Sequence, residues 1–214
     1  MKLTRRAFAT SGLICGADLC CGGLVTPVYA QRAIPFCGFS LEDGWTAYGR
    51  EFVTREARGN DRSGVPQIVR RILEELGLDY DFRILITEDE DNAYATVAGG
   101  RKILGIDVDF LDRLNDQVGT EWSAIQVIAH EVGHHIAGFD TDSHRGELNA
   151  DYWSGQALQR LGSSSDAAQA AILAIGSERD TSSHPNKYRR AAVIARGWDD
   201  ASNDIIDRSF CQDC

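Results

Sequence analysis

The chain has 214 residues, with 22 Lys and Arg against 32 Asp and Glu, and a formal net charge of −10 at pH 7. With 43% hydrophobic and 25% charged residues, the composition is typical of a globular protein and disfavours a disordered chain or a coiled coil. The acidic excess argues against a nucleic-acid partner and against docking on anionic lipid, because both need a basic surface.

The first segment, residues 1–30, has the features of an export signal. A positively charged start that contains Arg5 and Arg6 precedes a weakly apolar stretch, and Val28-Tyr29-Ala30 fits a small-residue cleavage site. The paired arginines resemble a twin-arginine signal. We therefore expect a cleaved twin-arginine-type signal peptide over 1–30, a single domain over 31–214, and a periplasmic or secreted bacterial protein.

Three cysteines lie outside that segment: Cys37, Cys211 and Cys214. An exported protein meets oxidising conditions, so we expect Cys37 to form a disulfide with Cys211 or Cys214, and the sequence leaves the choice open. The spacing of Cys211 and Cys214 is also that of a redox motif. Their position at the end of the chain, with no βαβ pattern before them, disfavours a catalytic redox role.

The predicted elements place short strands before a series of helices. Apolar residues at helical spacing predict a helix over 65–76, followed by strands over 82–87, 93–97 and 103–108, the last two joined at Gly99-Gly100. Further helices are expected over 122–136, 148–161, 165–176 and 185–196, the last of them ending at Gly197. This order predicts an α+β fold with a small N-terminal sheet. After residue 30 no apolar run reaches the length of a membrane span.

The sequence His130-Glu131-Val132-Gly133-His134 is an HExxH motif within the predicted helix over 122–136. Residues four apart lie on one face of a helix, so His130 and His134 can hold one zinc ion. Glu131 lies beside them, where it can take a proton from a zinc-bound water. The adjacent His135 points about 100° away from His134 and is not expected to be a ligand.

A catalytic zinc site needs a third protein ligand, and Glu147 is the main candidate. Glu147 and Asp151 are again four residues apart, so Asp151 can accept the free ring N–H of His130 while Glu147 binds the metal. Two alternatives stay open. Asp140 lies where metzincins place a ligand, although Ala137 replaces the glycine which that pattern needs, and His144 is the other.

The motifs HEVGHH and ELNAD together resemble gluzincin peptidases of the HtpX and CAAX-prenyl endopeptidase type. The resemblance implies a zincin-like fold, with Glu147 as the third zinc ligand and Asp151 behind the ligands. It also implies that Asn92, Ala93, Tyr94 and Ala95 form a strand with which an extended substrate pairs. Ser183-His184-Pro185 is similar to a segment that lies near the active site in this family.

These residues together predict a zinc-dependent endopeptidase with one Zn²⁺ per chain and a peptide or protein substrate. Glu131 acts as the general base, and His184 stabilises the oxyanion, with Arg189 or Arg190 as alternatives for that role. Two other functions stay open: a zinc-stabilised binding protein without turnover, and a zinc hydrolase that acts on substrates other than peptides.

Overall fold

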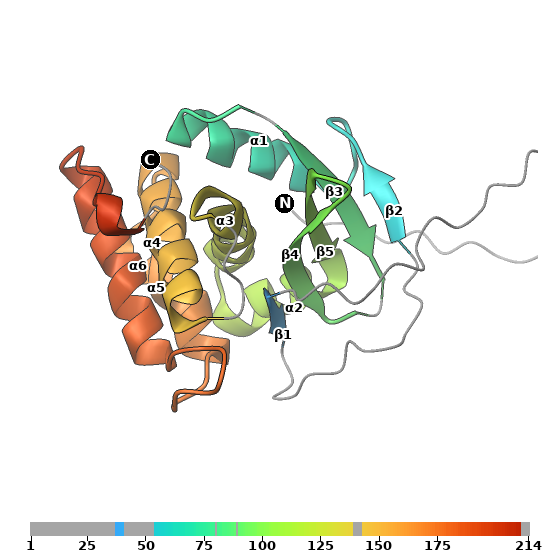
Figure 1. Ribbon diagram of the computed structural model, residues 1–214. Coiled ribbons are helices and arrows are strands. Elements are labelled where there is room, and N and C mark those ends of the chain that lie inside the picture. Colours follow the sequence, from blue (N-terminus) through green and yellow to red (C-terminus); the bar gives the residue numbers. More distant parts are fainter. Residues whose placement is uncertain (1–36, 41–53, 80, 89, 139–142, 211–214) are drawn as a thin grey trace, which may run out of the picture. The chain divides into compact units, whose positions relative to one another are not determined.

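A computed structural model describes residues 37–40, 54–79, 81–88, 90–138 and 143–210, all within one compact unit, Ile34–Cys214 (Figure 1). The predicted signal peptide, Asp140, Cys211 and Cys214 lie outside the described residues, and Cys37 is described only through its backbone. The export signal and the disulfide therefore stay predictions.

A sheet of five strands forms one layer of this unit, in the order β1-β4-β5-β3-β2. The β3 and β5 strands are parallel, and the other neighbouring strands are antiparallel. The strands are β1 (Cys37–Ser40), β2 (Thr54–Ala57), β3 (Phe82–Thr87), β4 (Asn92–Ala98) and β5 (Arg101–Asp107).

Six α-helices and one short 3-10 helix complete the described fold. They are α1 (Val65–Leu76), α2 (Val108–Val118), α3 (Trp122–Ile136), α4 (His144–Leu161), α5 (Ser165–Ile175), α6 (Lys187–Ser202) and η1 (Arg208–Phe210). The predicted α+β class is confirmed. No helix among the described residues is long and apolar enough to cross a membrane.

Several elements begin and end where local sequence signals predict. The α1 helix has a proline in its first turn and ends at Gly77, whose φ of 68° is the left-handed conformation that closes a helix. The β4–β5 hairpin turns at Gly99 and Gly100, with φ of 59° and 75°, which glycine adopts without strain.

Three predicted boundaries were wrong. The α4 helix begins at His144 rather than at 148, because the Ser143 side chain caps it by accepting the N–H of Gly146 at 3.0 Å. The α6 helix covers Lys187–Ser202 rather than 185–196, because Asn186 caps its start. Gly197 does not end α6. It lies inside the helix, where a Cβ would be 2.1 Å from the carbonyl oxygen of Tyr152 on α4.

The α2 helix and the β1 and β2 strands were not predicted. The α2 helix has clear end signals, since Asp107 accepts the N–H of Phe110 at its start and Gly119 ends it with φ of 81°. These signals were overlooked because the helix is short and begins directly after the β5 strand. Four-residue strands such as β1 and β2 carry too few residues for an alternating pattern to stand out.

The α3 helix lies between the sheet and the α4, α5 and α6 helices, as Figure 1 shows. It contacts β4 and β5 on one side and α4 and α5 on the other, and α4 packs along α6. Its apolar residues, among them Val127, Ile128 and Val132, belong to the main hydrophobic core. The HExxH sequence is therefore carried on the most enclosed helix of the described fold.

Candidate metal centre

The HExxH residues lie at the buried centre of α3. The side chains of His130, Glu131 and His134 are all 0% exposed. Polar groups are placed in such surroundings only when partners compensate for the loss of water. Each of these side chains therefore needs a neighbouring group that offsets its loss of contact with water.

The α4 helix packs closely on α3 at this point because Gly133 has no side chain. A Cβ on Gly133 would lie 2.6 Å from the carbonyl oxygen of Ala150. This contact brings two carboxylates of α4 against the histidines of α3. They are Glu147, one turn before Ala150, and Asp151, which follows it directly. Both carboxylates are 0% exposed.

Three ligand atoms converge between α3 and α4. The Nε2 atoms of His130 and His134 are 3.0 Å apart, and each is 3.5 Å from an oxygen of Glu147. Two ligands about 2.1 Å from one zinc ion in a tetrahedral site lie about 3.4 Å from each other. The three side chains form a group that could hold a metal ion, and their spacing fits such an ion.

Asp151 and Arg190 hold this group in position, and Asp151 bonds His130 on the side away from the other ligands. Asp151 Oδ1 lies 2.8 Å from His130 Nδ1, which leaves Nε2 of the same ring directed at His134 and Glu147. Arg190 on α6 donates to both carboxylate oxygens of Asp151, at 2.7 Å from Nε and 2.9 Å from Nη2. Its Nη2 is also 3.2 Å from Glu147 Oε2. Asp151 thus orients a histidine, and Arg190 holds Asp151.

Burial and neighbouring charges set the protonation state of each group in the cluster. Burial and the neighbouring His130 lower the pKa of His134 to about 3, so its imidazole is neutral and able to ligate. Burial acts to raise the pKa of Glu147, but Arg190 and the histidines hold it well below its usual value. Burial acts to lower the pKa of His130, yet Asp151 raises it to about 9. A bound metal ion would take the place of that proton.

Glu131 lies beside the cluster and is not a member of it. Burial raises the pKa of Glu131 well above 4.5, and neither of its carboxyl oxygens has a hydrogen-bond partner among the described residues. Glu131 is thus a buried carboxyl group next to a ligand histidine, on a helix that contacts the β4 strand.

His184 reaches the same site from the segment before α6. Its Nε2 atom is 3.6 Å from Glu147 Oε2, and its Nδ1 atom is 2.8 Å from Ser183 Oγ. Burial lowers its pKa. About a quarter of its side chain is exposed, at 24%, whereas the three clustered side chains are closed to solvent. The structure thus brings the predicted His184 to the cluster, on its more open side.

His144, the alternative ligand that the structure describes, does not join the cluster, and neither does His135, which was not expected to be a ligand. His144 donates from Nε2 to the carbonyl oxygen of Thr181 at 2.8 Å, and His135 donates to that of Ile103 at 3.1 Å. His135 also packs edge-on against Phe82, away from the other histidines. Asp140 lies outside the described residues.

The sequence reasoning missed the connection between Arg190 and Asp151. Arg189 and Arg190 were expected only as alternatives to His184 for stabilising the oxyanion, whereas Arg189 is exposed and pairs with Asp180 at 2.8 Å. The helical spacing could have indicated that Arg190 is buried. It lies on the same face of α6 as the buried residues Ile194, Gly197 and Ala201.

The predicted substrate strand, Asn92 to Ala95, forms the first half of β4. Ala93 and Ala95 are both 0% exposed, and the strand contacts α3. Tyr94 points to the other face, where its ring covers Gly105 on β5, because a Cβ on Gly105 would lie 2.1 Å from that ring. Small side chains thus face the helix that carries the cluster.

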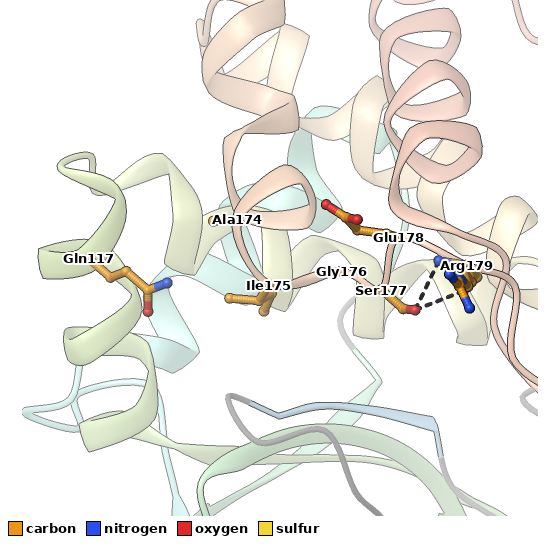
Figure 2. Close-up of a pocket in the computed structure, with 7 residues that line it drawn as sticks. All are labelled: Gln117, Ala174, Ile175, Gly176, Ser177, Glu178 and Arg179. Carbon is orange, nitrogen blue, oxygen red and sulfur yellow. Dashed lines mark hydrogen bonds between the residues drawn. The ribbon is translucent and has the colours of Figure 1, made fainter.

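A hollow of about 510 Å³ elsewhere on the molecule is separate from this cluster (Figure 2). It lies at the end of α5, and its Ser177 hydroxyl is already bonded to the backbone of Arg179, at 2.8 Å and 3.2 Å. Its lining residues are Gln117, Ala174, Ile175, Gly176, Ser177, Glu178 and Arg179. They include no histidine or cysteine, so the hollow offers no comparable chemistry.

Comparison with known proteins adds no relative. No protein-family model matches the chain, and neither a curated protein nor a solved structure matches it. Functional inference for this chain therefore depends on the geometry of the cluster itself.

Proposed function

We propose that this chain is a zinc-dependent endopeptidase with a zincin-like architecture. The observation that carries the proposal is a buried group of two histidines and one glutamate, with a further buried glutamate, Glu131, beside it. Three protein ligands and a separate glutamate match the arrangement by which HExxH zinc enzymes hydrolyse peptide bonds.

His130, His134 and Glu147 would hold the metal, with Asp151 fixing the ring of His130. A zinc ion at this position supplies a Lewis acid that polarises a substrate carbonyl group and acidifies a water molecule. Zinc suits a ligand set of two imidazoles and one carboxylate, whereas calcium and magnesium prefer sites made of oxygen ligands alone.

Glu131 would move the proton. It would accept a proton from the attacking water and deliver one to the leaving amine, a role that its position next to the ligand His130 allows. His184 reaches the open side of the site, where it can donate to the oxygen of the carbonyl under attack. The β4 strand would align an extended peptide backbone next to Glu131.

Three variants separate the roles of these acids. Glu131→Gln should keep zinc but lose activity, because an amide cannot accept the proton. Glu147→Ala should lose both, because two histidines alone bind zinc weakly. Asp151→Asn should reduce metal affinity or activity by about 10–100-fold. Zinc content by mass spectrometry and hydrolysis of casein measure both properties.

His144→Ala is the matched control, because His144 is a histidine near the start of α4 whose ring bonds a carbonyl group instead of the cluster. It should keep both zinc and activity. The proposal fails if Glu147→Ala retains zinc at the level of the unsubstituted chain, or if Glu131→Gln hydrolyses casein at an undiminished rate.

A further inference from the structure

The β4 strand, on which the proposed function aligns a substrate, already has a partner from the same chain. The β1 strand pairs with it in antiparallel orientation and forms the edge of the sheet on that side. The register places Cys37 opposite Ala95, Gly38 opposite Tyr94, Phe39 opposite Ala93 and Ser40 opposite Asn92. The paired stretch of β4 is thus the same four residues that are expected to pair with a peptide.

The ladder between β1 and β4 lies against α3, the helix that carries the HExxH residues. Ala95, which lies opposite Cys37, is fully buried, and its strand contacts α3, the helix that carries Glu131. The β1 strand also contacts α3, the helix that carries His130 and His134. Figure 1 shows β1 as the short dark-blue strand near β4 and α3. A peptide approaching Glu131 along β4 would meet β1 in its place.

The attachment of β1 is of a kind that another peptide can replace. A ladder of four residues contains few hydrogen bonds, each with a net contribution of about 0.5–1.5 kcal/mol. Strand addition depends mainly on main-chain hydrogen bonds, which any extended peptide can form. An extended substrate can therefore compete with β1 for the edge of β4.

We propose that β1 is an internal occupant of the peptide-binding edge of β4 and inhibits the site until a substrate displaces it. This inference rests on the proposed function, because it takes β4 as the strand that receives the peptide. The apparent affinity for a peptide is then reduced by the fraction of molecules in which β1 is paired.

A release variant tests the occupancy in the full-length chain. Gly38→Pro with Phe39→Pro removes two adjacent N–H groups, of which one faces β4 in an antiparallel ladder. Gly38→Ala with Phe39→Ala is the matched control, because it keeps both N–H groups. The probe is a fluorescein-labelled peptide with the sequence of residues 35–42 and serine in place of cysteine. Binding is measured by anisotropy in a Glu131→Gln background, so the peptide is not consumed.

A lock variant tests the opposite state. Ser40→Cys with Asn92→Cys places two thiols at residues that face each other across the ladder. The protein is compared before and after reduction, and peptide mapping verifies the engineered bond. The unsubstituted chain treated in the same way is the control, because reduction also breaks any disulfide of Cys37. We expect the proline pair to bind the peptide about tenfold more tightly than the alanine pair. The oxidised lock should not bind the peptide, and reduction should restore binding.

The inference is overturned if the proline and alanine pairs bind equally, or if the oxidised lock binds the peptide as well as the reduced protein does. Hydrolysis of casein with Glu131 intact separates this result from the proposed function. If binding changes as expected and no form hydrolyses casein, β1 occupies the edge and the peptidase proposal fails. If the locked and reduced forms hydrolyse casein at the same rate, the peptidase proposal stands and the inference about β1 fails.

Discussion

Arg190 is the residue through which the α6 helix reaches the candidate metal centre. Its side chain is almost fully buried and forms a two-pronged ion pair with Asp151, which in turn bonds His130. Burial acts to raise the pKa of Asp151, but Arg190 and His130 lower it overall. The negative charge that orients His130 therefore depends on a cation supplied by a distant part of the sequence.

We expect Arg190→Gln to destabilise the protein and to weaken metal binding. Removal of one partner from a buried ion pair leaves an uncompensated charge and costs about 3–5 kcal/mol. The loss of support for His130 should also reduce metal affinity by about 10–100-fold. Urea unfolding monitored by circular dichroism measures the first effect, and zinc titration against a chromophoric chelator measures the second.

Arg189→Gln is the control for this prediction. The Arg189 side chain is 48% exposed, and its ion pair with Asp180 lies at the surface. Solvent screens such a pair, so stability and metal affinity should be nearly unchanged. Similar losses in the two variants would show that Arg190 has no special part in the site.

At the scale of elements, the site depends on how closely three helices approach one another. Gly133 lets α4 pack on α3, and two further glycines let α6 pack on α4. A Cβ on Gly155 would lie 2.1 Å from the carbonyl oxygen of Ile194, and one on Gly197 would lie 2.1 Å from that of Tyr152. These contacts set the distance between Arg190 on α6 and the carboxylates on α4.

We expect Gly197→Ala to destabilise the protein by about 1–3 kcal/mol, because the added methyl group meets backbone atoms that cannot turn aside. Helix propensity alone would predict the opposite sign, since alanine is favoured over glycine by about 1 kcal/mol. Thermal unfolding and zinc content measure the effect on packing and on the site together.

Ala192→Gly provides the comparison on the same helix, because Ala192 is exposed and its change alters propensity without a clash. It should cost about 1 kcal/mol and leave zinc content unchanged. An increase in stability in Gly197→Ala would contradict the packing argument.

The elements that the sequence predicts well are those whose signals are local. The ends of α1 and the turn between β4 and β5 follow from glycines in left-handed conformations, and the HExxH spacing follows from helical geometry. Gly197 shows the limit of this reasoning. The same residue type that ends a helix elsewhere is needed here for contact with α4, and only the fold distinguishes the two uses.

Some residues of the candidate site can be predicted from local motifs, and others can be found only from the fold. His130, Glu131, His134, Glu147 and Asp151 come from two local motifs with a period of four residues, so the sequence indicates them together. The role of Arg190 and the pairing of β1 with β4 join segments that are far apart in the chain. No local pattern encodes such pairings, because they depend on how the helices and strands come together.

At the scale of the whole molecule, the cluster joins segments that would otherwise be independent. Its ligand atoms come from α3 and α4, while Arg190 and His184 approach from α6 and the segment before it. These groups converge only in the folded chain. A metal ion that binds there binds the folded state and not the unfolded one, so it should stabilise the whole unit rather than one helix.

We therefore expect metal removal to lower the melting temperature of the entire protein in a single transition. A ligand at 100 times its dissociation constant adds about 2.7 kcal/mol of stability. For a chain of this size each kcal/mol corresponds to roughly 2–4 °C, so treatment with a chelator should lower Tm by about 5–10 °C. Zinc should restore it, and magnesium should not, because magnesium prefers sites made of oxygen ligands. Differential scanning calorimetry of the chelated and reloaded protein measures both.

Two variants connect this shift to the cluster. Glu131→Gln should show the full shift in Tm on zinc binding, because Glu131 lies outside the group of ligand atoms. Glu147→Ala should show little or none, because it lacks one of the three ligands. If Glu147→Ala gains as much stability from zinc as the unsubstituted chain does, the metal binds elsewhere on the molecule, and the buried histidines and carboxylates of α3 and α4 need another explanation.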